Sequence, residues 1–166
     1  RRACKRLPAM SSIIEQRIAT LLGNFGLLPF VALAVAVWMP WEPWQIAKLQ
    51  AALVAYAAVI LSFLGAVHWG LVLATPNLDR SQAWNALLWG VMPALLGWLA
   101  LLMLMLGLPA WMVFAFLIGD LWLARLVDGS LMPMYTVASQ WYLGLRTRLT
   151  LVATLALGAA AIAAAR

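Results

Sequence analysis

An apolar run from Leu49 to Thr75 constrains this chain more than any other feature of its sequence. As an α-helix, a run of about 26 residues is roughly 39 Å long, which exceeds the roughly 30 Å hydrocarbon core of a bilayer. The run therefore predicts a membrane-spanning helix. It also contains His68, the only histidine among the 166 residues.

Four further apolar runs accompany this one. The chain is 66% hydrophobic and only 10% charged, whereas soluble domains are near 25% charged. We therefore expect an all-α membrane protein: one bundle of five transmembrane helices. Pro29 and Pro93 should kink the first and third spans, since proline removes a backbone donor. The expected parts are a basic amino-terminal tail at 1–20 and spans at about 21–38, 49–75, 85–106, 109–127 and 143–165.

Lysine and arginine near the span ends predict the orientation. Lys48 and Arg166 fall on one side of the membrane. If translation begins at Met10, five basic residues remain on the amino-terminal side against two on the other side, and the predicted orientation is unchanged. We expect a cytoplasmic amino terminus in a bacterial inner membrane, or a matrix one in a mitochondrial inner membrane. The basic residues of the amino-terminal side are Arg1, Arg2, Lys5, Arg6, Arg17, Arg80, Arg125, Arg146 and Arg148.

The net charge of +6 does not indicate nucleic acid, because the basic residues lie at the ends of apolar runs. Three of them, Arg125, Arg146 and Arg148, are expected at the inner interface. The expected partners are the lipid bilayer and other membrane protein subunits. Cys4 and His68 alone do not form a ligand set, so we expect no metal and no cofactor.

His68 and Asp120 are the residues that could carry chemistry. Each lies about seven residues before the cytoplasmic end of its predicted span, which gives them equal depth near 10 Å. Asp120 and Arg125 point apart on their helix, whereas Arg125 and Asp128 are three residues apart and can pair. The sequence therefore predicts a His68–Asp120 contact.

Two further residues complete the candidate ligand or proton site. Asn24 lies near the depth of His68, and Trp69 could line a pocket. A histidine held by an aspartate suits a proton relay or an oriented donor, but it also suits a polar contact that merely joins helices. Both readings stay open. Nucleophilic catalysis has little support, because Ser62 is about 240° around the helix from His68.

Small residues recur at every fourth position of the second span. Such a face lets another helix come close within lipid. We expect this face to pack against a helix rather than against lipid. It consists of Ala58, Ser62, Ala66 and Gly70.

Three segments carry a resemblance: Gly26–Phe30, Ser62–Gly70, and Trp141–Tyr142 with the arginine–leucine pairs that follow. They are similar to a small bacterial inner-membrane family of unknown function that includes mitochondrial transmembrane protein 69. The resemblance implies a multi-span helical protein of a bacterial or mitochondrial inner membrane. It implies no reaction.

From these observations we expect a non-enzymatic protein that acts through helix contacts. Small loops and a small-residue face suit an accessory subunit or assembly factor of a larger, respiratory-type membrane complex. The alternative is a binder or carrier of a hydrophobic or protonatable ligand at a His68/Asp120 site. An intramembrane enzyme is the third class, with the least support.

Overall fold

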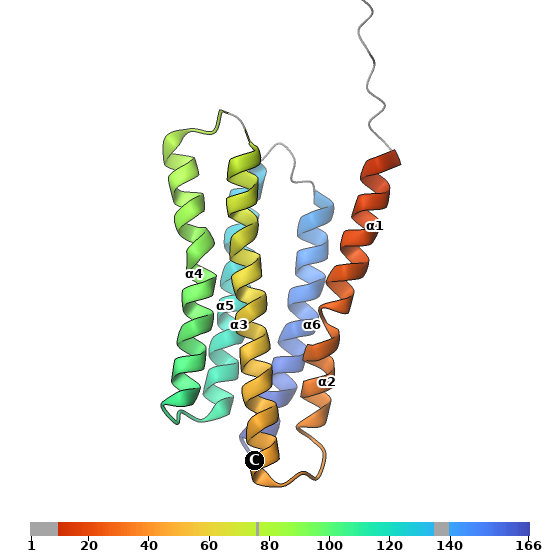
Figure 1. Cartoon of the computed structure of the whole chain (residues 1–166), viewed down its shortest axis with the longest axis vertical. Coiled ribbons are helices and arrows are strands. Elements are labelled where there is room, and N and C mark those ends of the chain that lie inside the picture. Colours follow the sequence, from red (N-terminus) through yellow and green to blue (C-terminus); the bar gives the residue numbers. More distant parts are fainter. Residues whose placement is uncertain (1–9, 76, 135–139) are drawn as a thin grey trace, which may run out of the picture.

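The structure is a computed structural model that describes residues 10–75, 77–134 and 140–166, and the regular secondary structure within these residues is all helical (Figure 1). Predictions that concern Cys4 and the basic residues before Met10 lie outside the described residues. The elements are α1 (Met10–Phe25), α2 (Leu28–Ala36), α3 (Pro43–Ala74), α4 (Arg80–Met105), α5 (Ala110–Leu131), the 3-10 turn η1 (Met132–Met134) and α6 (Gln140–Ala164).

Five segments of the described chain are long and apolar enough to cross a membrane, which confirms the predicted class of fold. Their bounds differ from the predicted ones. α3 begins six residues early at Pro43, because Glu42 and Gln45 form a reciprocal capping box at its start. α5 continues to Leu131, so Asp128 is helical rather than part of a connecting loop. α1 begins at Met10, within the segment predicted as a tail.

The first span consists of two helices. α1 ends at Phe25 and α2 begins at Leu28, with Pro29 in its first turn. Proline is favoured at this position because its missing N–H has no helical partner there anyway. The Tyr56 hydroxyl donates a 2.7 Å hydrogen bond to the carbonyl oxygen of Gly26, which satisfies one acceptor at the break. Pro93 lies inside α4, which is continuous.

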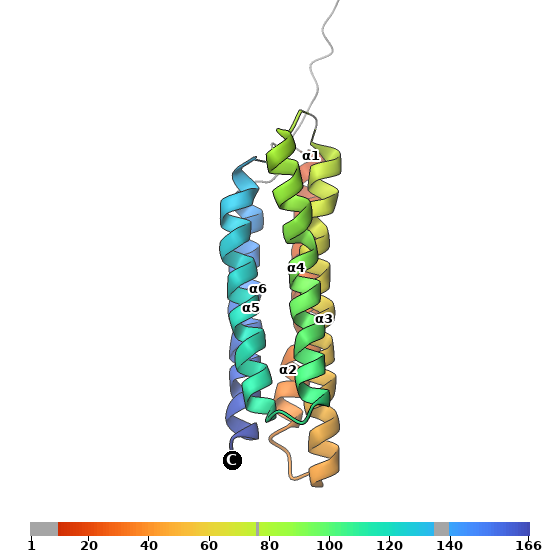
Figure 2. The same cartoon turned by 90° about the vertical axis from the view of Figure 1, so that its left-hand side faces the viewer.

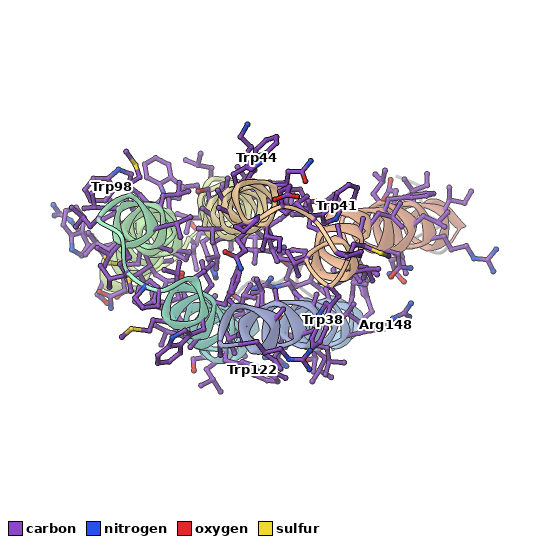
Figure 3. The ribbon with its side chains drawn as sticks, turned by 90° about the horizontal axis from the view of Figure 1, so that it is seen from below. Trp38, Trp41, Trp44, Trp98, Trp122 and Arg148 are labelled. Carbon is purple, nitrogen blue, oxygen red and sulfur yellow. The ribbon has the colours of Figure 1, made fainter. Side chains whose placement is uncertain are left out.

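The helices form two layers, with α3 and α4 in one and α5 and α6 in the other (Figure 2). α2 closes one side of the bundle by contacting both α3 and α6, while α1 contacts α6 and leans outward toward its start (Figure 1). Seen from the end where α2 joins α3, three tryptophans lie near α2 and the start of α3 (Figure 3). These exposed rings are Trp38, Trp41 and Trp44. Aromatic side chains of this kind suit a membrane–water interface.

Glycine allows the closest helix contact, between α3 and α4. A Cβ added to Gly65 would overlap the carbonyl oxygen of Gly90, and one added to Gly97 would lie 3.0 Å from the Cα of Ala58. Ala58 thus packs against Gly97 of α4. The other three residues of the predicted face, Ser62, Ala66 and Gly70, are exposed. The face that packs within this chain is therefore rotated from the predicted one, because α4 lies over Gly65 instead.

Candidate functional site

A buried cluster of three ionisable side chains joins three helices. The carboxylate of Asp128 on α5 lies between His68 on α3 and Arg146 on α6. His68 Nε2 is 2.9 Å from Asp128 Oδ1, while Arg146 Nε donates at 2.8 Å to Oδ2 and Arg146 Nη2 lies 2.6 Å from the same oxygen. The exposed fraction is 0% for His68 and 3% for both Asp128 and Arg146. We call these residues the triad.

The charges of the triad define its protonation chemistry. An ionised carboxylate only accepts hydrogen bonds, so Nε2 of His68 carries the proton that points at Asp128. Arg146 balances the charge of Asp128, so the triad is neutral when His68 is neutral. The triad thus places an imidazole beside a carboxylate that is already paired with an arginine, an arrangement that can orient a hydrogen-bond donor or hold a proton.

The predicted contact between His68 and Asp120 is wrong, because the carboxylate that meets His68 belongs to Asp128. The depth estimate failed because α5 extends to Leu131 and α3 ends at Ala74. Asp120 therefore lies about 17 Å from the end of α5, whereas His68 is about 9 Å from the end of α3. The predicted Arg125–Asp128 pair is also wrong, since Arg125 Nε donates at 2.7 Å to the Thr147 hydroxyl.

Asp120 is nevertheless buried, with an exposed fraction of 4%. Neither of its carboxyl oxygens has a hydrogen-bond partner in the described part of the chain. A carboxyl group near the middle of a membrane costs roughly 2.5–3.5 kcal/mol on insertion scales. Asp120 is therefore an unbalanced polar group separate from the triad.

The remaining predicted residues lie at different places. Arg148 is exposed and donates at 3.2 Å to Asn24 Oδ1, so Asn24 contacts Arg148 rather than His68. Trp69 is 47% exposed and donates at 3.2 Å to the carbonyl oxygen of Leu87, so it lies across α4. Arg146, predicted at the inner interface, is buried in the triad.

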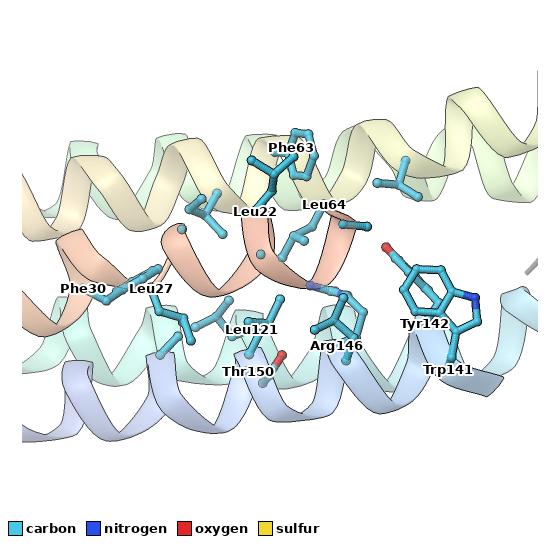
Figure 4. Close-up of a pocket in the computed structure, with 18 residues that line it drawn as sticks. Leu22, Leu27, Phe30, Phe63, Leu64, Leu121, Trp141, Tyr142, Arg146 and Thr150 are labelled. Atoms are coloured by element: carbon cyan, nitrogen blue, oxygen red, sulfur yellow. The ribbon is translucent and has the colours of Figure 1, made fainter. Parts of the chain in front are cut away.

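A largely apolar cavity of about 400 Å³ lies beside the triad, between α1, α2, α3 and α6. Its size falls within the range of small-molecule sites. Phe30 and Leu64 are among its apolar lining residues, while Arg146, Thr150 and Tyr142 contribute its polar groups (Figure 4). The sequence did not predict this cavity, because it depends on how far α1 leans from the bundle.

The hydroxyl group of Thr150 differs from most others in these helices. Those of Thr20, Ser62, Thr75 and Thr147 donate to the carbonyl oxygen four residues earlier, at 2.8–2.9 Å. That of Thr150 is buried without a hydrogen-bond partner in the described residues, as is that of Thr154. Thr150 lines the cavity and Thr154 does not.

Comparison with known proteins places the chain. Residues 15–162 match the family model described as "Protein of unknown function (DUF3429)". The chain belongs to this family. It is also 38% identical over 141 residues to Transmembrane protein 69 of Xenopus tropicalis, in a match covering 84% of this chain and 51% of that protein.

The family assignment agrees with the resemblance found in the sequence. This chain spans about half the length of the curated relative it matches. No solved structure matches the chain. The family and the five apolar helices together identify a multi-pass membrane protein of a family of unknown function.

Proposed function

We propose that this protein binds, without chemical conversion, an elongated apolar molecule that carries a hydrogen-bond acceptor. The observation that carries the proposal is the apolar cavity of about 400 Å³ with Arg146 and Thr150 on its wall. A membrane-dissolved molecule could enter from the side on which α1 leans away. The proposed location is a bacterial inner membrane, or the mitochondrial inner membrane in a eukaryote.

The donors on the cavity wall favour an uncharged acceptor such as a carbonyl or ester oxygen. A guanidinium has five N–H donors. Nε donates to Asp128, while Nη2 lies 2.6 Å from the same carboxylate but has no hydrogen-bond partner in the described residues, so the guanidinium keeps donors for a ligand. The Thr150 hydroxyl supplies a second donor. Because Asp128 already balances Arg146, a neutral ligand keeps the site neutral, whereas a carboxylate would bring unbalanced charge into the membrane.

Photo-crosslinking of the detergent-purified protein tests this proposal. The probe is a long-chain methyl ester with a diazirine in its chain, and the comparison probe is the matching diazirine alkane. We expect the ester to label cavity residues such as Leu64, as located by mass spectrometry, and the alkane to label them less. Thr150→Val should weaken labelling by the ester but not by the alkane.

Thr154→Val is the matched control. Thr154 lies one turn further along α6 and outside the cavity, and its buried hydroxyl also has no hydrogen-bond partner in the described residues. Ala19→Phe should block both probes by filling the space at α1, where Ala19 lines the cavity. If labelling spreads evenly over the lipid-facing surface, or if Ala19→Phe leaves it unchanged, the proposal is wrong.

A second function, that of an accessory subunit or assembly factor, is favoured by the exposed face of α3. Ser62, Ala66 and Gly70 are small and exposed. A Cβ added to Gly70 would meet no atom within 4 Å in the described residues. Such a face can receive a helix of another membrane protein at close range.

Ala66→Leu separates this function from ligand binding. It should leave the stability of the isolated protein unchanged but release any partner subunit, seen as a smaller complex by native gel electrophoresis in mild detergent. Ala115→Leu alters an exposed alanine on α5 and is the control. An unchanged complex with Ala66→Leu would count against a helix partner on this face.

A further inference from the structure

A second hollow lies on the other side of α1 from the cavity. It is a crevice of about 620 Å³ between α1 and α6. Arg17 and Gln16 line it from α1, while Arg148, Gly144 and Trp141 line it from α6. α1 exposes different positions to the two hollows, since Ala19 and Gly23 line the cavity and Arg17 and Leu21 line the crevice.

The positive charge in this crevice is not balanced. Among the described residues, no acidic side chain lines it. Within the described residues, neither Arg17 nor Arg148 takes part in an ion pair, and Arg148 contacts only the neutral amide oxygen of Asn24. Figure 3 shows Arg148 on the side of the bundle where α6 lies beside the first span. Two guanidinium groups facing one hollow favour an anion there.

The position of the crevice along the helices suits a lipid headgroup. Arg17 is seven residues from the start of α1, and Arg148 is eight residues from the start of α6. Eight helical residues correspond to about 12 Å, within reach of the headgroup zone for a long side chain. Trp141 is suited to the same zone. Leu21 and Gly144 provide an apolar path past the arginines.

We propose that the crevice between α1 and α6 binds an anionic phospholipid from the leaflet at the amino-terminal end of the bundle. Its phosphate lies between Arg17 and Arg148, and one acyl chain follows Leu21 past Gly144. The site differs from the cavity in its charge, in its ligand and in the face of α1 that lines it, although Trp141 and Leu145 on α6 line both hollows. Arg17 and Arg148 line only the crevice, while Arg146 and Thr150 line only the cavity, so variants at these residues distinguish the two sites.

Native mass spectrometry of the detergent-purified protein measures this binding. Phosphatidylglycerol and phosphatidylcholine with identical acyl chains are the two probes. We expect tighter binding of phosphatidylglycerol. Arg17→Gln and Arg148→Gln should each weaken it about fivefold, the weight of one basic side chain at an anionic surface. Arg80→Gln removes an exposed arginine from the start of α4, outside the crevice, and should change nothing.

A steric variant tests the acyl-chain path without altering charge. An added Cβ at Gly144 or at Gly158 would meet no atom within 4 Å in the described residues, so a larger side chain begins in open space at both positions. Gly144→Leu fills the crevice and should weaken binding of phosphatidylglycerol several-fold. Gly158→Leu lies on the same helix outside the crevice and should have no effect.

Three outcomes would overturn the proposal. The first is equal binding of the two phospholipids. The second is that Arg80→Gln weakens the binding of phosphatidylglycerol as much as Arg148→Gln does, which would indicate a general effect of net charge. The third is displacement of phosphatidylglycerol by an equal concentration of glycerol phosphate, which would identify a site for a soluble phosphate rather than a lipid.

Discussion

Gly65 on α3 and Gly90 on α4 bring two helix backbones into direct contact, with no room for a Cβ at Gly65. Gly65→Ala should therefore lower the free energy of unfolding by about 1–3 kcal/mol, the usual cost of overpacking. Unfolding in mixed detergent micelles, followed by circular dichroism, gives the value. Gly70→Ala is the matched control: it faces open space and should be neutral or stabilising by up to about 1 kcal/mol. Equal effects at both positions would contradict the contact.

Asp128→Asn should be strongly destabilising. It leaves the buried guanidinium of Arg146 without its counter-charge, and loss of one member of a buried pair costs about 3–5 kcal/mol. Adding Arg146→Gln to Asp128→Asn should recover part of the stability. A double-mutant cycle measures the coupling, and additive losses would show that the two side chains act separately.

Asp120→Leu should instead stabilise the protein. The carboxyl group of Asp120 is buried without a hydrogen-bond partner in the described residues, and such a group costs about 1–3 kcal/mol. The same unfolding experiment should show a gain of this order. A loss of stability would show that Asp120 is held by a bound molecule or by a partner protein.

Asp79, in the connection before α4, should titrate below the usual range of a carboxyl group. The hydroxyl and backbone N–H groups of Ser81 donate to its Oδ2 and lower its pKa from the ordinary value of 3.8. Its contribution to stability is therefore complete above that value and is lost as the pH falls through the lowered pKa. Ser81→Ala should raise the pKa, as measured by carbon NMR of the Asp79 carboxyl group. An unchanged pKa would contradict the helix cap that the structure assigns to Asp79.

The orientation of the bundle stays a prediction that labelling can test. Cysteine replaces Glu42 at one end of the bundle or Ser81 at the other, in a chain carrying Cys4→Ser. A membrane-impermeant maleimide added to intact cells should label the Glu42→Cys variant and not the Ser81→Cys variant. The reverse pattern would mean that the amino terminus faces outward.

The number and approximate bounds of the spans follow from the sequence because bilayer thickness fixes the length of an apolar run. Pro29 was a local signal of an irregularity in the first span because it has no N–H to donate, but the position of the break, between Phe25 and Leu28, came only from the structure. The family could also be recognised from short segments around His68. These properties depend on neighbouring residues or on the solvent, and hence on information that the chain carries locally.

The partner of His68 could not be obtained in this way. Asp128 and Asp120 lie on the same buried side of α5, and the choice between them depends on where α5 ends and how it is set against α3. The unpredicted cavity likewise depends on the lean of α1.

The sequence by itself determined that this is a five-span membrane protein with polar residues within its spans. Only the tertiary structure decided which of those residues meet and where hollows remain. The physical reason is that lipid solvates every apolar helix face almost equally well. Helix register and rotation therefore depend on close contacts such as that of Gly65 with Gly90.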